Sequence, residues 1–411
     1  MTQAPDVRQA AAPPVLLVAA ALALAAAVSL GLARFSYALL LPPMRADLGW
    51  SYLTAGAMNT VNAGGYLLGA LAVSRWIDRI GARALFIGGM VATAVLLALH
   101  GSFSATGALY LLRLATGVAS AATFVSGGLL ATRLVVDHGE PTALGTRTPS
   151  AGLVLGIYSG GTGAGIVASA LVVPPLIARS AAHAWQAAWL GLGALAFVAA
   201  AVVAVQTRSL RAAVPRHGPR GSADLRSLAA GLCSYLLFGL GYIGYMTFVV
   251  TLLREQGLAA GAIVAFYALL GLAVIASSWI WAPLLQRHRG GGPMTLLNGL
   301  VALATVLPVL SPHPVAVFAS GLLFGAVFLS IVASTTALVR HNLPPTAWAG
   351  GIGAFTIVFA FGQIVGPSAV GWIADAAGGL RAGLACSAFV LLLAAVVASR
   401  QKPMALPTSA A

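Results

Sequence analysis

The sequence predicts an all-α integral membrane protein in which twelve transmembrane helices form two six-helix bundles related by a parallel repeat. Three observations predict this fold class: the composition, the number of long apolar runs and an internal repeat. The 411 residues are 60% hydrophobic and only 7% charged, whereas soluble domains carry about 25% charged residues. Because a globular surface cannot be built from so few charges, we expect most of the chain to lie within a bilayer.

Twelve apolar runs are long enough to cross a bilayer, since a transmembrane helix needs about 20 apolar residues. The first run continues to Leu41 and is too long for the core of a signal peptide, so we expect a retained first helix. The runs are continuous rather than alternating, which excludes a closed β-barrel. In chain order they cover residues 15–41, 53–74, 84–100, 107–132, 150–178, 185–206, 228–252, 262–284, 294–311, 315–339, 348–373 and 380–399.

An internal repeat relates the two halves of the chain. Residues 31–37 (Gly-Leu-Ala-Arg-Phe-Ser-Tyr) are echoed by residues 239–245 (Gly-Leu-Gly-Tyr-Ile-Gly-Tyr), an offset of 208 residues that continues without a gap through the fourth span. Because six spans separate the copies, both have the same orientation, which is typical of a six-plus-six transporter. We expect bundles at 1–206 and 228–411, joined by a cytoplasmic linker at 207–227.

The basic residues predict the orientation in the membrane. With the N-terminus inside, Arg45, Arg179, Arg254 and Arg381 fall outside, Arg34 and Arg113 fall within spans, and the other sixteen of the 22 Lys and Arg residues are cytoplasmic. This bias follows the positive-inside rule. The net charge of +14 is therefore explained by topology and predicts no nucleic-acid partner. We expect a multi-pass protein of the inner (plasma) membrane with both termini in the cytoplasm.

Two arginines lie within apolar runs, Arg34 in the first span and Arg113 in the fourth. An arginine at the centre of a membrane helix costs about 2.5–3.5 kcal/mol. Arg34 is roughly 12 Å from Pro42 along the helix axis, at about 1.5 Å per residue, so reaching the interface would strain its side chain. We therefore expect Arg34 to face a cavity. Arg113 either contacts the substrate or braces the helices by binding backbone carbonyls.

Other polar side chains complete the predicted substrate site. Tyr37 lies three residues after Arg34 and so shares its helix face, and Tyr242 and Tyr245 repeat this spacing in the second half. These tyrosines would serve equally well as interfacial anchors, and interhelical hydrogen bonds are the alternative role for the asparagines. The predicted substrate-binding residues are Arg34, Tyr37, Asn59, Asn62, Arg113, Tyr242, Tyr245 and Gln363.

The acidic residues bear on both the substrate and the energy source. All eight Asp and Glu residues fall in loops or at span ends, so the two arginines have no acidic partner within the spans. A positive cavity without a counter-ion attracts an anion, and the planar fork of arginine suits a carboxylate or phosphate. We therefore predict a small organic anion as substrate. Membrane carboxylates are common proton relays, and their absence here leaves both a co-transported proton and facilitated diffusion open.

Sequence motifs resemble those of the major facilitator superfamily. Residues 74–83 (Ser-Arg-Trp-Ile-Asp-Arg-Ile-Gly-Ala-Arg) resemble the family signature G-x-L-a-D-R-x-G-R-R between helices 2 and 3, with Ser74 at the usual first glycine. The fourth span has Arg113 and Gly117 in the arrangement of the family's R-x-x-x-G motif. Residues 31–42 resemble the first helix of the YbfB/YjiJ-type branch, which implies no particular substrate. The fifth span lacks the Gly-Pro of the antiporter motif, which disfavours a drug/proton antiporter.

The same resemblance implies a cytoplasmic gate. In the family, the acid of the signature helps to latch the two halves when the inside is closed, and this acid corresponds to Asp78. We expect Arg79 and Arg83 to belong to the gate, with Arg133 at the end of the fourth span as a partner. The alternative is that these are solvated loop charges, because exposed ion pairs contribute little.

Together these features predict a secondary active or facilitative transporter that works by alternating access. The alternative to an organic-anion carrier is an efflux transporter of amphipathic compounds, with Tyr37, Tyr242, Trp279 and Trp281 forming an apolar cavity. A membrane sensor or membrane-embedded enzyme is a remote alternative, because no metal cluster, nucleophile elbow or phosphate-binding loop occurs in a suitable context. We expect a monomer in the lipid bilayer that binds a small molecule and holds no cofactor or metal.

Overall fold

The computed structural model describes residues 15–137, 151–178, 182–208, 210, 224–376 and 378–404, and within these ranges the chain is helical without strands. The first half contains α1 (Val15–Ala26), a π-helix (Ala27–Phe35), α2 (Tyr37–Leu48), α3 (Tyr52–Ile80), α4 (Ala82–His100), α5 (Thr106–Asp137), α6 (Ala151–Ile177) and α7 (Ala184–Gln206). The second contains α8 (Ala229–Glu255), α9 (Ala260–Ile280), α10 (Ala282–Arg287), α11 (Gly292–Leu310), α12 (Pro314–Asn342), a 3-10 turn (Pro345–Ala347), α13 (Trp348–Ala376) and α14 (Gly379–Ala398).

The twelve predicted spans are confirmed in the described part of the chain. Eleven helical segments are long and apolar enough to cross a membrane, including Val15–Leu48 and Ala260–Arg287, which each join consecutive helices. The twelfth is α3, which is 29 residues long. It is less apolar than the others because it carries Asn59, Asn62 and a charged C-terminal end. These polar groups face protein rather than lipid, as both asparagines are buried.

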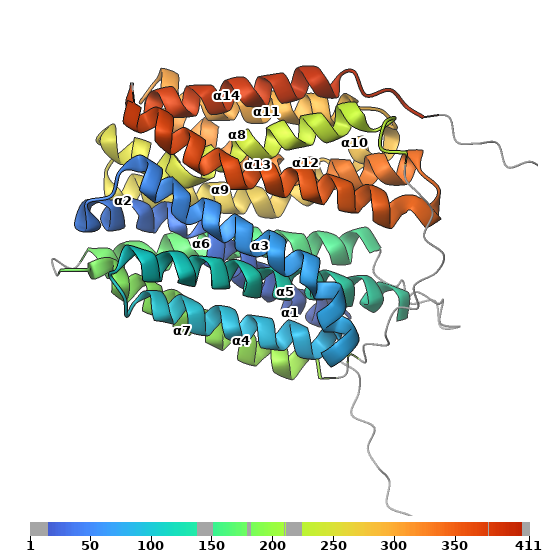
Figure 1. Ribbon diagram of the computed structural model, residues 1–411, viewed down its shortest axis with the longest axis horizontal. Coiled ribbons are helices and arrows are strands. Elements are labelled where there is room, and N and C mark those ends of the chain that lie inside the picture. The colour runs from blue at the N-terminus through green and yellow to red at the C-terminus, as the bar shows by residue number, and fades with distance from the viewer. Residues whose placement is uncertain are drawn as a thin grey trace, which may run out of the picture.

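The helices form two halves that lie one above the other, with α1–α7 in the lower half of Figure 1 and α8–α14 in the upper half. Shifting α3, α4 and α5 by 208 residues gives 260–288, 290–308 and 314–345, within three residues of α9–α10, α11 and α12. The predicted offset is therefore confirmed through the fourth span. Most of the predicted linker lies outside the described residues, which include only 207, 208, 210 and 224–227 of it.

The helices that carry few polar residues lie farthest from the boundary between the halves. In Figure 1, α4 and α7 are at the bottom of the molecule, and α11 and α14 are at the top. The helices that meet across the boundary include α3 with α13, α6 with α9, and α2 with α8. The third, sixth, ninth and twelfth spans therefore form the outer parts of the two halves, and the other spans lie nearer the boundary.

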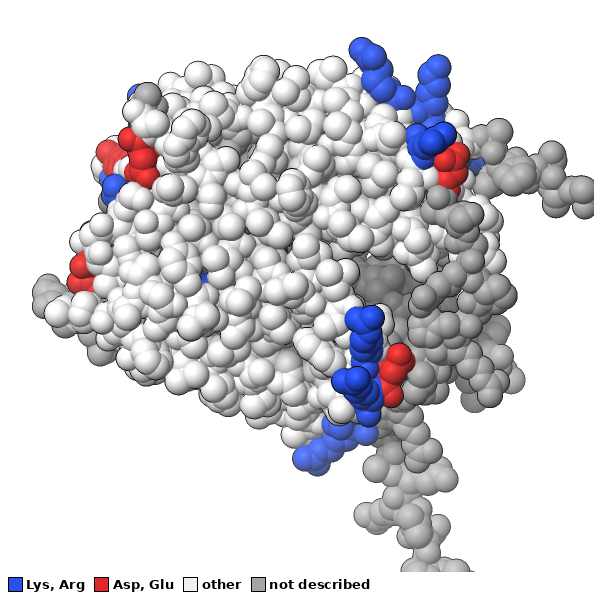
Figure 2. Space-filling model, viewed as in Figure 1, with Lys and Arg blue, Asp and Glu red and all other residues white. Residues whose placement is uncertain are grey.

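The molecule has two ends, which we name the Asp375 end and the Arg79 end after residues at the ends of α13 and α3. Figure 2 shows charged side chains gathered at both ends of one face, with a broad, almost uncharged surface between them. Among the described residues, the Asp375 end has Arg45, Arg254 and Arg381, and the other Lys and Arg residues outside the spans lie at the Arg79 end.

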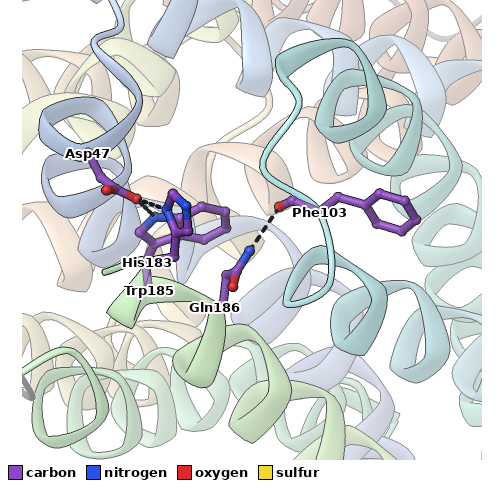
Figure 3. A network of polar contacts seen from close by, with 5 residues as sticks. All are labelled: Asp47, Phe103, His183, Trp185 and Gln186. Atoms are coloured by element: carbon purple, nitrogen blue, oxygen red, sulfur yellow. Dashed lines mark hydrogen bonds and ion pairs between the residues drawn. The ribbon is translucent and has the colours of Figure 1, made fainter. Parts of the chain in front are cut away.

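A polar network at the Asp375 end holds the first half together (Figure 3). Asp47 at the end of α2 accepts hydrogen bonds from His183 Nδ1 and from Trp185 Nε1, both at 2.5 Å. Gln186 Nε2 donates to the carbonyl oxygen of Phe103, in the connection between α4 and α5, at 3.4 Å. The network therefore ties the start of α7 to two other segments of the same half and does not reach the second half.

Candidate functional site

The first span changes its helix type where Arg34 is located. Residues Ala27–Phe35 form a π-helix with Arg34 in its last turn, and the Ser36 N–H donates to the Gly31 carbonyl five residues earlier at 3.0 Å. Such wide turns are frequent at functional sites. Two carbonyl oxygens of this segment accept side-chain hydrogen bonds from elsewhere. Arg113 Nη1 donates to Ala33 at 2.9 Å, and Tyr267 Oη donates to Phe35 at 2.6 Å.

Arg113 is fully enclosed by protein and joins three helical segments. Besides Ala33, its guanidinium donates to the Met58 carbonyl at 3.4 Å and to Asn59 Oδ1 at 2.9 Å. Its Cζ also lies 4.8 Å from the centre of the Tyr37 ring. The side chain is 1% exposed and is not among the residues that line the cavity described below. These contacts match the bracing role, one of the two alternatives that the sequence left open.

Four other candidates make buried contacts away from the cavity. Asn59 Nδ2 donates to Thr247 Oγ1 at 2.7 Å, which joins α3 to α8. The remaining contacts connect Asn62 Nδ2 with the Arg113 carbonyl at 3.0 Å, Tyr37 Oη with the Ala55 carbonyl at 2.9 Å, and Tyr245 Oη with Ser320 Oγ at 2.6 Å. These side chains link helices to one another and fix the walls behind the site.

A cavity of about 320 Å³ lies between the two halves. This volume is at the lower end of the range for small-molecule sites, about 300–1,000 Å³. Three of the predicted residues line it, namely Arg34 from the first half and Tyr242 and Gln363 from the second. Tyr66 of α3 also lines it, and its ring centre is 5.9 Å from Arg34 Cζ. The sequence prediction missed Tyr66, although it follows Asn62 by four residues and so shares its helix face.

Arg34 is a buried cation without a counter-ion. Its side chain is 4% exposed, and its Nε and Nη2 atoms have no hydrogen-bond partner among the described residues. The single carboxylate ion pair of the described residues joins Asp47 to His183, at the Asp375 end. A buried charge is costly unless it is paired, so the free donors of Arg34 provide a strong site for an anion that enters the cavity.

The second half contributes a polar pair to the same cavity. Gln363 Nε2 donates to Tyr242 Oη, which leaves the hydroxyl hydrogen of Tyr242 available to a ligand. The two tryptophans considered for an apolar cavity have other environments. Trp281 Nε1 donates to the Ala326 carbonyl at 2.7 Å, Trp279 is exposed, and neither lines the cavity.

Contacts between the halves close the molecule at the Asp375 end. The two Asp375 carboxylate oxygens accept hydrogen bonds from the backbone N–H groups of Tyr52 and Leu53, at 2.9 and 2.8 Å. These are free donors at the N-terminus of α3. Tyr52 Oη also donates to Glu255 of α8. Nearby, a Cβ added to Gly56 would lie 2.3 Å from the Pro367 carbonyl oxygen, so the backbones of α3 and α13 touch directly.

The predicted gate residues lie at the opposite end, toward which the cavity extends through Ala70, Gly128, Val332 and Thr356. Asp78 and Arg79 are exposed, Arg133 is half-buried, and no ion pair among the described residues involves any of them. Arg83 binds within the first half, where its Nε and Nη2 donate to the Thr207 and Ala204 carbonyls at 2.9 and 3.1 Å. Among the described residues, side-chain hydrogen bonds therefore join the halves at the Asp375 end, and the predicted gate residues make no such contact at the Arg79 end.

Two repeated six-span halves around a central cavity define a membrane transporter of the major facilitator type. The family model described as "Uncharacterised MFS-type transporter YbfB" matches residues 26–399. The chain belongs to this family, which confirms the resemblance found in its first helix. No curated protein sequence matches the chain.

Solved structures with the same fold are distant in sequence. A bacterial homologue of the human lysosomal transporter Spinster, in an inward-facing and unoccupied conformation, matches with a TM-score of 0.71 at 16% identity, over 97% of this chain and 100% of that one. The nucleoside transporter NupG matches with a TM-score of 0.63 at 16% identity, over 94% of this chain and 96% of that one. Such low identities support the common fold and carry no substrate from those proteins to this one.

Proposed function

We propose that this transporter carries a small organic anion by alternating access and that Arg34 binds the anionic group. The observation that carries the proposal is the buried Arg34 guanidinium, which lines the central cavity with two donors unpaired among the described residues. Its planar fork can bind a carboxylate through two parallel hydrogen bonds. Tyr242 is the partner from the second half, because its hydroxyl can donate to the same anion. A ligand held in this way would contact both halves.

The roles of the remaining predicted residues follow from their contacts. We assign Arg113 as a positioning residue, because it binds the Ala33 carbonyl next to Arg34 from within the first half. Tyr267 binds the Phe35 carbonyl on the other side of Arg34, from the second half. The backbone that carries Arg34 is therefore held by both halves, so a relative movement of the halves would alter the position of the guanidinium.

The Arg79 end is assigned to the cytoplasm on the positive-inside rule. Eleven described basic residues outside the spans lie at this end, and three lie at the Asp375 end; the eleven are Arg75, Arg79, Arg83, Arg133, Arg208, Arg226, Arg287, Arg289, Arg340, Arg400 and Lys402. In this orientation in the inner membrane, both termini are cytoplasmic and the cavity faces the cytoplasm. The two bundles, at 1–206 and 228–411, would move relative to each other around the central site that contains Arg34. The linker at 207–227 joins them. One chain supplies the whole site, so a monomer suffices.

The positions of the acidic residues limit how a proton could be co-transported. No acidic residue lies in the middle of a described span, since Asp47, Asp78, Glu255 and Asp375 are all at helix ends. A co-transported proton would then travel on the carboxyl group of the substrate rather than on a protein carboxylate.

The alternative function is efflux of amphipathic compounds. The apolar walls of the cavity favour this alternative, but Arg34 would repel a cationic compound.

A ligand screen tests the proposed function. The melting temperature of the purified full chain is measured with carboxylates, phosphate, sugars and cationic amphipathic dyes. We expect carboxylates to raise it, because a ligand that binds only the folded state stabilises that state by mass action. Stabilisation by cationic dyes and by none of the anions would contradict the proposal and support the efflux alternative.

The Asp375 contacts predict how the conformational equilibrium responds to mutation. Asp375→Asn removes the charge from two hydrogen bonds that join the halves. We expect the closed Asp375 end to open more often, by about 1.5 kcal/mol or roughly tenfold in population. The measurement is the rate at which an impermeant maleimide labels Thr251→Cys, at a buried position near this end, with Cys233 and Cys386 replaced by Ser.

The matched control for Asp375 is Asp47→Asn. Asp47 is an acid at the same end, but its contacts with His183 and Trp185 remain within the first half. This control should leave the labelling rate of Thr251→Cys near that of the parent protein. Equal labelling in the Asp375 variant and the parent would show that the Asp375 contacts do not hold this end closed.

The opposite response is expected for Asp78→Asn. Asp78 forms no ion pair in this conformation, among the described residues, so a latch role would be exercised only when the Arg79 end is closed. Removing the charge should therefore favour the present conformation, and a cysteine at the cavity position Val332 should react faster. The control is Asp224→Asn, another exposed acid at this end whose hydrogen bonds are local. Unchanged labelling would show that Asp78 is a solvated loop charge without a latch role.

A further inference from the structure

Aromatic side chains are the most numerous kind in the wall of the Arg34 cavity, with eight of the nineteen lining residues. Eight Phe and Tyr residues from both halves line it: Phe35, Tyr66, Phe124, Tyr235, Phe238, Tyr242, Phe328 and Phe359. Five of these belong to the second half, on α8, α12 and α13. Aliphatic side chains would have made an apolar wall equally well, so the choice of rings favours a ligand that gains from aromatic contact.

Four of these rings are nearly parallel. Tyr235, Phe238, Tyr242 and Phe359 stack with centroid separations of 4.6–5.8 Å and interplanar angles of 10–18°. Offset parallel stacking is a preferred geometry of aromatic pairs. We name these four residues the ring array. Because its members share one orientation and line the cavity, a flat ring that enters the cavity can continue the stack.

The charge of the cavity limits the ligand to one anionic group. Arg34 is the single ionisable Lys, Arg, Asp, Glu or His residue among those that line it. A second carboxylate on the ligand would therefore be taken out of water without a cationic partner, which is costly. The polar groups that remain on the lining, Tyr66, Tyr242, Thr356 and Gln363, can hydrogen-bond but cannot neutralise a charge.

The size of the cavity limits the body of the ligand. The cavity volume of about 320 Å³ is at the lower end of the range for small-molecule sites, about 300–1,000 Å³. A one- or two-ring compound is of a size that this space can hold.

We propose that the substrate is a planar aromatic monocarboxylate of one or two rings. This inference rests on the proposed function. Its carboxylate pairs with Arg34 of the first half, and its ring stacks on the ring array of the second half. Such a ligand bridges the two halves through two different interactions, so both must be in place for tight binding. An aliphatic acid would make the first interaction and lose the second.

The test is equilibrium titration of the purified full chain with four probes, the first three of which match in size. Benzoate and cyclohexanecarboxylate have the same charge and number of non-hydrogen atoms, benzamide lacks the charge, and terephthalate carries a second carboxylate. We expect benzoate to bind about tenfold more tightly than cyclohexanecarboxylate, on the scale of one good aromatic contact. Benzamide and terephthalate should bind more weakly than benzoate. This series uses the unmodified protein, so it does not depend on the folding of any variant.

Two variants then assign the preference to the ring array. Phe359→Leu keeps an apolar side chain but removes one ring of the array, and it should reduce the preference for benzoate. Phe324→Leu is the control, because Phe324 is buried against Tyr245 at 4.1 Å and does not line the cavity. The control should keep the preference. The same loss in both variants would contradict the role of the ring array.

The outcomes separate this inference from the proposed function. Equal binding of benzoate and cyclohexanecarboxylate, lost in both cases with Arg34→Gln, would overturn the aromatic preference and leave the anion carrier in place. Binding of terephthalate as tight as that of benzoate would overturn the limit to one charge. If no carboxylate bound in a manner that depends on Arg34, both the inference and the proposed function would be wrong.

Discussion

Arg34→Gln is expected to weaken carboxylate binding strongly and to stop transport at ordinary substrate concentrations, without reducing the stability of the empty protein. Truncating one partner of a buried, hydrogen-bonded charge pair costs about 3 kcal/mol, so the substitution should weaken binding roughly a hundredfold. The empty protein should be unaffected or more stable, because Arg34 Nε and Nη2 have no partner to lose among the described residues. A functional residue is expected to show this combination, whereas a structural one would not.

The Arg34 prediction is measured by counterflow of a labelled carboxylate in proteoliposomes, together with thermal unfolding without ligand. Arg34→Lys keeps the charge but loses the planar fork, so we expect intermediate affinity. Arg254→Gln is the control for a lost positive charge, since Arg254 is exposed at the end of α8 and does not line the cavity. Retained counterflow in Arg34→Gln, or a lower melting temperature with full binding, would contradict the prediction.

Arg113→Gln is expected to have the opposite signature, a large loss of stability in the absence of any ligand. The substitution leaves the Ala33 carbonyl and Asn59 Oδ1 without the donors that they have at 2.9 Å. Each buried acceptor left unsatisfied costs about 1–3 kcal/mol, so we expect a loss of about 3 kcal/mol in total. Because Ala33 precedes Arg34, carboxylate affinity should also fall as the guanidinium loses its position.

The Arg113 prediction is checked by thermal unfolding of the empty protein beside the parent and Arg34→Gln. Arg83→Gln provides a matched control, because Arg83 also donates to two backbone carbonyls but does so from a half-buried position at the Arg79 end. Its loss should be smaller than that of Arg113. If Arg113→Gln kept its melting temperature and lost only carboxylate binding, Arg113 would be a ligand-binding residue and the bracing role would be wrong.

The fold could be predicted because the features that determine it can be recognised along the sequence, without knowledge of contacts between distant residues. Apolar length gave the spans, and the 208-residue offset gave the repeat, which the structure reproduces in α3–α5 and α9–α12. The signature around Asp78 and the first helix gave the family, which the match over residues 26–399 confirms. Even α3, the least apolar span, contains one of the predicted apolar runs, at residues 53–74.

The site was only partly predictable because composition does not indicate which side of each helix faces the cavity. Arg34 was identifiable as a charge in an apolar run, but the ring array was not, since aromatic side chains in such a run serve lipid-facing and cavity-facing positions alike. Tyr37 shows a second limit. Its three-residue spacing from Arg34 predicts a shared face in an α-helix, but the π-helix ends between them, and Tyr37 instead donates to the Ala55 carbonyl.

The structure of the full chain with 4-iodobenzoate, with the iodine located by its anomalous scattering, tests anion binding by Arg34 most directly. We expect one site in the cavity, with the carboxylate oxygens about 2.7–2.9 Å from Arg34 Nε and Nη2 and the iodinated ring against Phe359 and its neighbours in the ring array. A carboxylate bound elsewhere, or a cavity occupied with the carboxylate directed away from Arg34, would contradict this expectation.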